Sequence, residues 1–171
     1  MSEWRVTQDH HSNLGRDTIT DGVPYLRITC PDIPWQRRRA IAEQLTGAVS
    51  DLFFHPRARL TREELREQTT VHFAPYRENE LFIGARTPEA RQAIDLTVEL
   101  SDWSMSVKQQ RRLAHHLTPL LAELFEIPPT RLDGINIRFH PYPPTDFAVG
   151  GRLLSDIVPL IGRLMKRLAS R

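Results

Sequence analysis

The hydrophobic positions of the chain follow two periodicities, which predict short strands and amphipathic helices. The runs YLRITC (25–30) and IDLTVEL (94–100) are short and rich in β-branched residues, as is typical of buried strands. Each run is followed by hydrophobic residues at helical spacing, which predict a helix with one buried face. These residues are Ile41, Leu45, Ala48 and Leu52 after the first run, and Leu113, Leu117, Leu120 and Leu124 after the second.

An internal repeat connects the two halves of the pattern. Segment 39–60, RAIAEQLTGAVSDLFFHPRARL, returns as RRLAHHLTPLLAELFEIPPTRL at 111–132, an offset of 72 residues. The run TVHFAPY (70–76) returns as NIRFHPY (136–142), an offset of 66 residues. Two matching blocks in the same order indicate one supersecondary unit that is used twice.

Each unit is predicted to be strand, helix, strand, so the expected fold is α+β (α/β) and contains two βαβ units. The units, about 24–76 and 93–142, should form a four-stranded mixed sheet with both helices on one face, because parallel strands joined by a helix cross over right-handedly. The other face is then uncovered, and we expect another copy of the chain to cover it.

The remaining segments complete the expected organisation. A polar N-terminal extension (1–23) precedes the domain (24–154), and a C-terminal amphipathic helix (155–171) with Ser155 as its N-cap follows it. That helix has a basic face, and we expect it to pack on protein rather than on a membrane surface. TREELRE predicts a short helix, and ELFIGARTP predicts a short extra strand that ends in a turn at Gly84.

Composition and charge narrow the class of protein. Of the 171 residues 40% are hydrophobic and 26% charged, as in soluble globular proteins. Cys30 is the only cysteine, and no apolar run is long enough to span a bilayer, so we expect a cytoplasmic protein without a membrane partner. The net charge is only +2, and the excess of basic residues lies in the C-terminal segment, which argues against a nucleic-acid partner.

Familiar catalytic motifs are absent from the sequence. It contains no phosphate-binding glycine loop, no HExxH and no Cys/His cluster at metal spacing, so we expect no cofactor and no metal. Two adjacent histidine pairs are expected to be solvated. His10 and His11 lie in the polar N-terminal extension, and His115 and His116 lie within a helix, where neighbouring residues face different directions.

The repeated strand ends carry the candidate chemistry. His72 in the first copy corresponds to Arg138 in the second, and alternate residues of a strand face one side, so His140 and Tyr142 are expected beside Arg138. Arg138 is suited to hold a carboxylate with its bidentate fork, and His140 to act as acid or base. The alternative is an ion-pair or hydrogen-bond network between subunits. The loop PTDFAVGG (144–151) has two interpretations: it covers this site, or it is a turn that leads into the last helix.

These features together resemble a known family. A proline that opens a strand (Pro24), VHFAPYRENELFIGA (71–85) and PPTRLDGINIRF (128–139) are similar to the tautomerase superfamily, in its fused double-unit branches such as cis-3-chloroacrylic acid dehalogenase and macrophage migration inhibitory factor. The resemblance spans residues 24–154. It implies a 4-oxalocrotonate tautomerase-like isomerase, a homotrimer, and a site for a small carboxylate-bearing keto or enol acid near the first proline.

The resemblance also implies roles for single residues. By position Pro24 is the catalytic proline, and the substrate-binding set would be Arg138, Arg27, Tyr25, Tyr142 and Phe147. The sequence departs from the family at three places: SDWSMS (101–106) lacks the arginines of the dehalogenase and decarboxylase branches, and Val149 and Val49 stand where an acid and a histidine are expected.

The position of Pro24 in the chain leads to two hypotheses about function. Its nitrogen follows Val23 and is a tertiary amide, with neither a proton to give nor a basic lone pair. The first hypothesis is therefore proton transfer through His140 or His72. The second is a non-catalytic trimeric relative that acts as a binding or structural module, with the site capped by the extension. Removal of the extension by proteolysis, which would free Pro24, is a third and weaker alternative.

Overall fold

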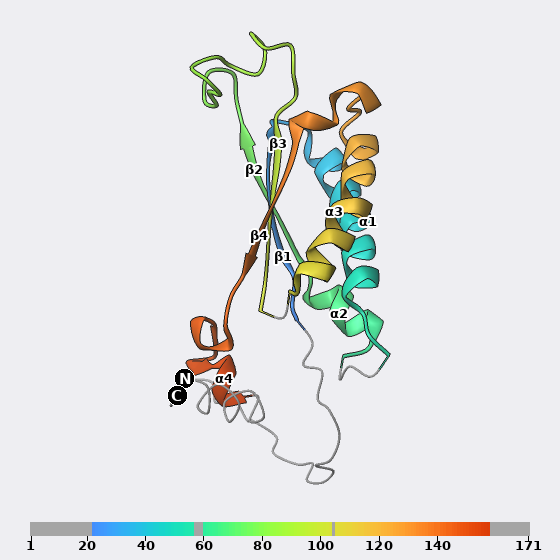
Figure 1. Ribbon diagram of the computed structural model, residues 1–171, viewed down its shortest axis with the longest axis vertical. Helices are drawn as coiled ribbons and strands as arrows, with labels where there is room; N and C mark the ends of the chain where they lie inside the picture. Colours follow the sequence, from blue (N-terminus) through green and yellow to red (C-terminus); the bar gives the residue numbers. More distant parts are fainter. Residues whose placement is uncertain (1–21, 57–59, 104, 158–171) are drawn as a thin grey trace.

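The computed structural model describes residues 22–56, 60–103 and 105–157. Figure 1 shows a narrow twisted sheet with helices on one side of it and two loop regions extending beyond its ends. The predicted N-terminal extension lies almost wholly outside the described residues, and so does the predicted C-terminal helix beyond residue 157.

The sheet has the predicted four strands in mixed orientation. Its order is β2-β1-β3-β4, with two parallel pairs at the edges and the antiparallel pair β1–β3 in the centre. The strands are β1 (Tyr25–Pro31), β2 (Thr70–Tyr76), β3 (Leu96–Asp102) and β4 (Ile135–Pro141). The first strand begins at the predicted residue, whereas β3 begins two residues later than the run 94–100 suggested.

Two long helices cover one face of the sheet, as predicted (Figure 1). They are α1 (Trp35–Phe53) and α3 (Val107–Leu124), and α3 continues through Pro119 as one element. The short piece TREELRE forms α2 (Arg62–Gln68), which begins with a capping box: the Thr61 hydroxyl accepts from the backbone N–H of Glu64, and the Glu64 carboxylate accepts from that of Thr61.

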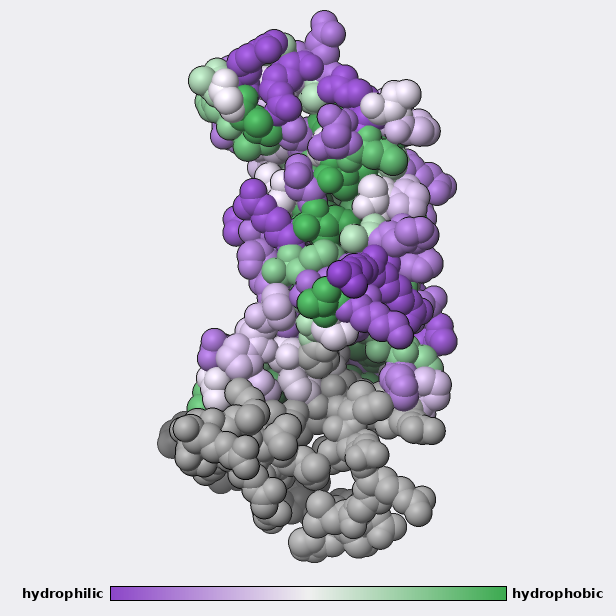
Figure 2. Space-filling view, viewed as in Figure 1, coloured by the Kyte–Doolittle hydropathy of each residue, from purple (hydrophilic) through white to green (hydrophobic). Residues whose placement is uncertain are grey.

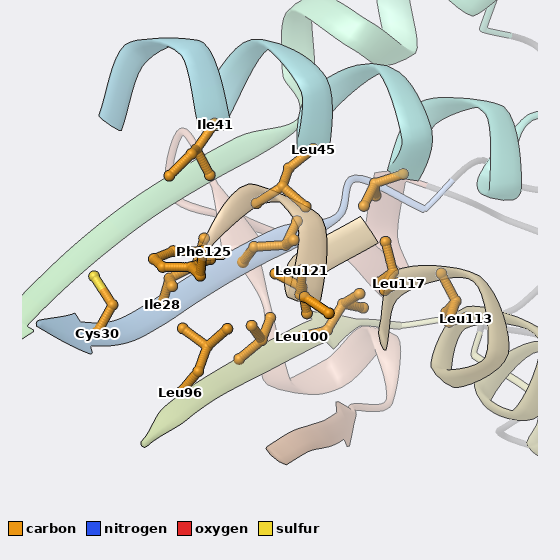
Figure 3. Packing of buried hydrophobic residues seen from close by; sticks show 14 of the residues in the cluster. Ile28, Cys30, Ile41, Leu45, Leu96, Leu100, Leu113, Leu117, Leu121 and Phe125 are labelled. Carbon is orange, nitrogen blue, oxygen red and sulfur yellow. The ribbon is translucent and has the colours of Figure 1, made fainter. Parts of the chain in front are cut away.

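The core lies between these helices and the two central strands. Figure 3 shows Ile28 and Leu100 from the strands directed toward Leu45 and Leu121 from the helices. The buried line of each helix is Ile41, Leu45, Val49 and Leu113, Leu117, Leu121. The predicted stripes were therefore right at their first two positions, but their later members, Ala48, Leu52, Leu120 and Leu124, are only partly buried.

Both ends of the sheet continue into irregular segments. The loop after β2 holds a single bridge, Ile83–Arg86, around a turn at Gly84 (φ 59°), so the predicted turn is confirmed but the predicted extra strand is wrong. Before β4 lies η1 (Pro129–Gly134). After β4 come η2 (Pro144–Asp146), β5 (Ala148–Val149), β6 (Arg152–Leu153) and α4 (Leu154–Ile157). Because α4 begins at Leu154, Ser155 lies inside it and is not its N-cap.

Hydrophobic residues are partly exposed along the edge strand β4. Figure 2 shows hydrophobic atoms gathered along the middle of the face where β4 runs, between hydrophilic flanks. Ile135, Ile137 and Phe139 of this strand pack against the core but are only partly buried, because β4 has a neighbour on one side only.

Candidate functional site

The face of the sheet away from the helices, the open face, carries mostly polar side chains. In β1 and β3 the residues that alternate with the buried ones are exposed or half-buried, and β2 and β4 continue the same alternation. The open-face residues are Tyr25, Arg27, Thr29, Thr70, His72, Ala74, Thr97, Glu99, Ser101, Asn136, Arg138 and His140.

Strand register places four ionisable residues in one line across the open face. Arg27 is the register partner of His72 on one side and of Glu99 on the other, and Glu99 is in turn the partner of Arg138. The sequence predicted Arg138, His140, His72 and Arg27 as site residues, and the register shows that all four lie on the same surface. Tyr25 lies on it as well, and its hydroxyl is 2.8 Å from Nδ1 of His72, a hydrogen bond.

Glu99 is the central carboxylate of the open face. Its Oε2 lies 3.9 Å from Nη1 of Arg27, and its Oε1 lies 3.8 Å from Nε2 of His140. Both separations exceed a hydrogen bond but bring three charged or chargeable groups together. Sequence reasoning missed Glu99. The alternation in LTVELSD was a signal for its side, but only the antiparallel register with β1 decides that it faces Arg27.

Arg138 stands apart from this cluster in one respect. Within the described residues it makes no ion pair, whereas Arg27 and His140 share Glu99. The open face therefore holds two arginines against one glutamate, and it is well suited to hold a small anion.

Pro24 does not belong to the open face. It is buried, it is in phase with Leu26 and Ile28 of the core face, and its carbonyl accepts a hydrogen bond from the N–H of Thr70 at 3.0 Å. His140 and Pro24 lie near the same end of the sheet, but the strand alternation places them on opposite faces.

Tyr142 and Phe147 lie together just beyond that end. Tyr142 follows the last residue of β4, its N–H donates to the carbonyl of Asp102 at 3.2 Å, and its ring centroid is 5.6 Å from that of Phe147. Burial, followed by the nearby charge of Asp102, raises the pKa of the Tyr142 hydroxyl. Tyr142 thus lies at the end of β4, next to Phe147 and one residue beyond the strand that carries Arg138 and His140.

Asp102 is the second residue that sequence reasoning missed. Its side chain is fully buried at the end of β3, and the backbone at Gly22 packs so tightly on its carboxylate that no β-carbon fits at position 22. This contact fixes where the chain enters β1.

A partly open hollow lies at the opposite end of the sheet. Its volume is about 450 Å³, and its lining includes Pro31, Tyr76 and Ile94, at or next to the ends of β1 and β2 and the start of β3. None of the predicted site residues lines it. Nearby Cys30 is buried, and burial raises the pKa of its thiol to about 11, so the thiolate that nucleophilic chemistry needs is not present at neutral pH.

Two features are absent from the part of the chain that the structure describes. No group of three His, Cys, Asp or Glu side chains in this part is placed to hold a metal ion. No helix in it is both long and apolar enough to cross a bilayer.

The chain matches solved structures but no family model and no curated protein. A fused 4-OT in a wild-type asymmetric trimer is 18% identical, with a TM-score of 0.63 over 78% of this chain and 98% of that one. Pt0534 inactivated by 2-oxo-3-pentynoate is 13% identical, with a TM-score of 0.62 over 78% and 99%. N1, a member of the cis-3-chloroacrylic acid dehalogenase family, is 19% identical, with a TM-score of 0.57 over 86% and 99%.

At these identities the similarity shows the fold alone. That fold is the tautomerase-superfamily fold, as the repeat and the resemblance predicted.

Proposed function

We propose that this chain, which has the tautomerase-superfamily fold, forms a homotrimer and binds a small anionic keto or enol acid on its open face, where it catalyses proton transfer without a free N-terminal proline. The observation that carries the proposal is the arrangement of Arg27, Arg138 and His140 around the single carboxylate of Glu99. The excess of positive charge attracts an anion, and an imidazole is present to exchange a proton.

Each residue has a separate role in this proposal. Arg138, which makes no ion pair with any described residue, holds the substrate carboxylate with its guanidinium fork. His140 moves the proton between carbon and oxygen, and Glu99, 3.8 Å away, orients its ring. His72, whose Nδ1 is hydrogen-bonded to Tyr25, is the second histidine within the same surface.

In the single chain the side chains of the open face are accessible to a ligand or to a neighbouring copy. Arg138 and His140 are exposed, and Tyr25 keeps 38% of its surface accessible. The fused 4-OT structures, which are trimers, support the trimer that we propose. The two edge strands, β2 and β4, also leave backbone groups available for pairing with neighbouring chains.

A second function, a non-catalytic binding module, is favoured by Pro24 alone. Its nitrogen is an amide, it is buried, and its carbonyl is part of the bonding between β1 and β2. The proline chemistry of the family requires a free secondary amine, which this arrangement does not provide. In this alternative the anion is bound but not turned over.

Ketonisation of enolised phenylpyruvate distinguishes the two functions. Full-length protein is compared with a chain that begins at Pro24, and with Arg138→Ala and His140→Gln. We expect both lengths of chain to be active to a similar degree, a loss of about tenfold or more in kcat/KM for Arg138→Ala, because a charged hydrogen bond is removed, and a fall mainly in kcat for His140→Gln.

Matched substitutions outside the open face serve as controls. Arg39→Ala removes an arginine that pairs with Glu43 on α1, and His116→Gln removes an exposed histidine of α3. Both should leave the rate unchanged. Activity only in the chain that begins at Pro24 would mean that the amine of the proline, and not His140, transfers the proton. Binding without turnover in either chain would favour the module, and unchanged ligand affinity in Arg138→Ala would contradict the assignment of Arg138.

A further inference from the structure

The hollow at the end of the sheet opposite Pro24 has the composition of a binding site. Its volume of about 450 Å³ lies in the range of small-molecule sites. Its apolar lining comes from three parts of the chain that are distant in sequence. These residues are Pro31, Pro88, Ala93, Ile94, Ile127 and Pro128.

The lining of this hollow contains two charged side chains, one arginine and one glutamate. Arg131 and Glu89 both line it, both are exposed, and neither forms an ion pair within the described residues. One guanidinium N–H of Arg131 donates to the carbonyl of Gln92 at 3.0 Å, which fixes the side chain and leaves its remaining donors for other partners. The hollow therefore combines an apolar interior with one cation and one anion.

Tyr76 is a buried residue of the lining with a polar group. The hydroxyl of Tyr76 donates to the carbonyl of Asp95 at 3.0 Å. The pKa of this hydroxyl rises to about 12, mainly through burial, and the charges of Asp95, Cys30 and Glu89 contribute to the rise. Tyr76 is held at Asp95 and Arg131 at Gln92, so both side chains are fixed to the backbone of residues 92–95.

Backbone contacts connect the two sides of the lining. Gln92 has a φ of 51°, a left-handed conformation that a non-glycine residue adopts only when its surroundings hold it. At Gly134 a β-carbon would come within 2.6 Å of the carbonyl oxygen of Ile94, so loop and η1 are in direct backbone contact. These contacts hold the two sides of the hollow together.

The internal repeat relates this end of the sheet to the other. Tyr76 ends β2 here, and its counterpart in the repeat, Tyr142, follows β4 at the end where Pro24 lies. The hollow therefore lies where the chain enters the second unit. The corresponding place in the first unit is the entry of the chain at Pro24.

We propose that this hollow is a second ligand site, separate from the open face, for a small amino-acid-like zwitterion with an apolar side chain. Arg131 receives the carboxylate, Glu89 receives the ammonium group, and the proline and isoleucine side chains contact the apolar part. A zwitterion satisfies both charges, whereas a ligand with one charge leaves the other without a partner.

The test uses the full-length protein and L-phenylalanine, with phenylacetate and phenethylamine as probes that carry only one of its two charges. Two-dimensional amide NMR titrations report affinity and location together. We expect L-phenylalanine to shift the amides of Gln92, Ala93 and Gly134, and to bind roughly tenfold more tightly than either single-charge probe, because each of these loses one charged contact.

Two substitutions separate the contributions of the two charges. Arg131→Gln should weaken L-phenylalanine about tenfold and leave phenethylamine unchanged, and Glu89→Gln should weaken L-phenylalanine similarly but not phenylacetate. Because Arg131→Gln also removes the contact to Gln92, Glu89→Gln provides the independent measurement if that variant does not fold. Arg138→Ala, on the open face, should not alter these affinities.

Three results would overturn the proposal. The first is an absence of shifts at Gln92, Ala93 and Gly134 in the assembled protein, as when a neighbouring copy covers the hollow. The second is equal affinity for all three probes, which would mean that neither charge takes part. The third is a loss of L-phenylalanine binding in Arg138→Ala with no effect of Glu89→Gln, which would move the ligand to the open face.

Discussion

At the scale of single residues, two glycines of this chain differ in whether their surroundings leave room for a β-carbon. Gly134 lies in a backbone contact where a β-carbon would be 2.6 Å from the carbonyl oxygen of Ile94. Gly47 lies inside α1, and a β-carbon there would meet only the guanidinium of Arg66, 3.0 Å away at the end of an exposed side chain. The first glycine is required by a neighbouring backbone, and the second is not.

The two alanine substitutions should therefore change stability in opposite directions. Gly134→Ala should lower the free energy of unfolding by about 1–3 kcal/mol, because the backbone of Ile94 has to move. Gly47→Ala should raise it by about 0.5–1 kcal/mol, since alanine loses less conformational entropy in a helix. Urea unfolding of both variants measures this, and a stabilising Gly134→Ala would show that the contact with Ile94 relaxes freely.

At the scale of secondary-structure elements, α2 depends on its capping box. The N–H of Thr61 donates to the Glu64 carboxylate at 2.8 Å, and the N–H of Glu64 donates to the Thr61 hydroxyl at 3.2 Å. The Glu64 carboxylate also accepts a hydrogen bond from the Thr61 hydroxyl at 2.8 Å, and the two bonds that it accepts from Thr61 hold the pKa of Glu64 below its usual value of 4.5. A lowered carboxylate pKa contributes stability that is present above pH 4.5 and lost as the pH falls through the folded-state pKa.

Thr61→Ala should cost about 1 kcal/mol of unfolding free energy at neutral pH, within the usual range for the loss of an N-cap. Glu64→Gln tests the charge in the same box, and its effect should disappear in acid. Glu63→Gln is the matched control, because Glu63 occupies the same first turn and shares the helix-dipole effect without the capping role. Equal effects of the Glu63 and Glu64 variants would mean that the dipole alone matters.

At the scale of the whole molecule, the open face and the two sheet edges govern assembly. A four-stranded sheet with helices on one side leaves a polar surface centred on Glu99 and two edges with unpaired backbone groups. In the proposed trimer this face is turned toward other copies, and positive charges from several chains approach one another around their glutamates. Assembly should therefore depend on the sign of the charge at position 99.

Sedimentation equilibrium should give the mass of three chains for the unaltered protein. Glu99→Arg should shift the distribution toward single chains, because it replaces the central carboxylate of the open face with another cation. Glu43→Arg makes the same change of charge on the helical side and should leave the mass unchanged. A single chain at micromolar concentration in the unaltered protein would contradict the trimer.

The fold was largely predictable because its information is local and is used twice. The matching blocks at 39–60 and 111–132, together with the strand pairs, indicated two βαβ units, and the sheet and helices agree with that prediction. The errors lie where a local pattern competes with tertiary packing. The later helix positions shifted because burial follows Val49 and Leu121, and ELFIGARTP remained a loop around one bridge.

The candidate site was predictable only in part. Alternation along a single strand was enough to group Arg138 with His140. It was not enough to include Glu99, because facing residues on different strands depend on a register that no local pattern encodes. Tyr142 lies one residue beyond the end of β4, where the alternation of the strand no longer decides the side on which a residue lies.

The sequence by itself determined the repeat, the type of each main element, the strand faces on which Arg27, His72, Arg138 and His140 lie, and the amide that blocks Pro24. All of these follow from periodicity and covalent structure. Tertiary structure decided the rest. It alone set Glu99 between Arg27 and His140, placed Pro24 on the core face, and formed the hollow between Glu89 and Arg131, because each of these depends on packing between segments distant in sequence.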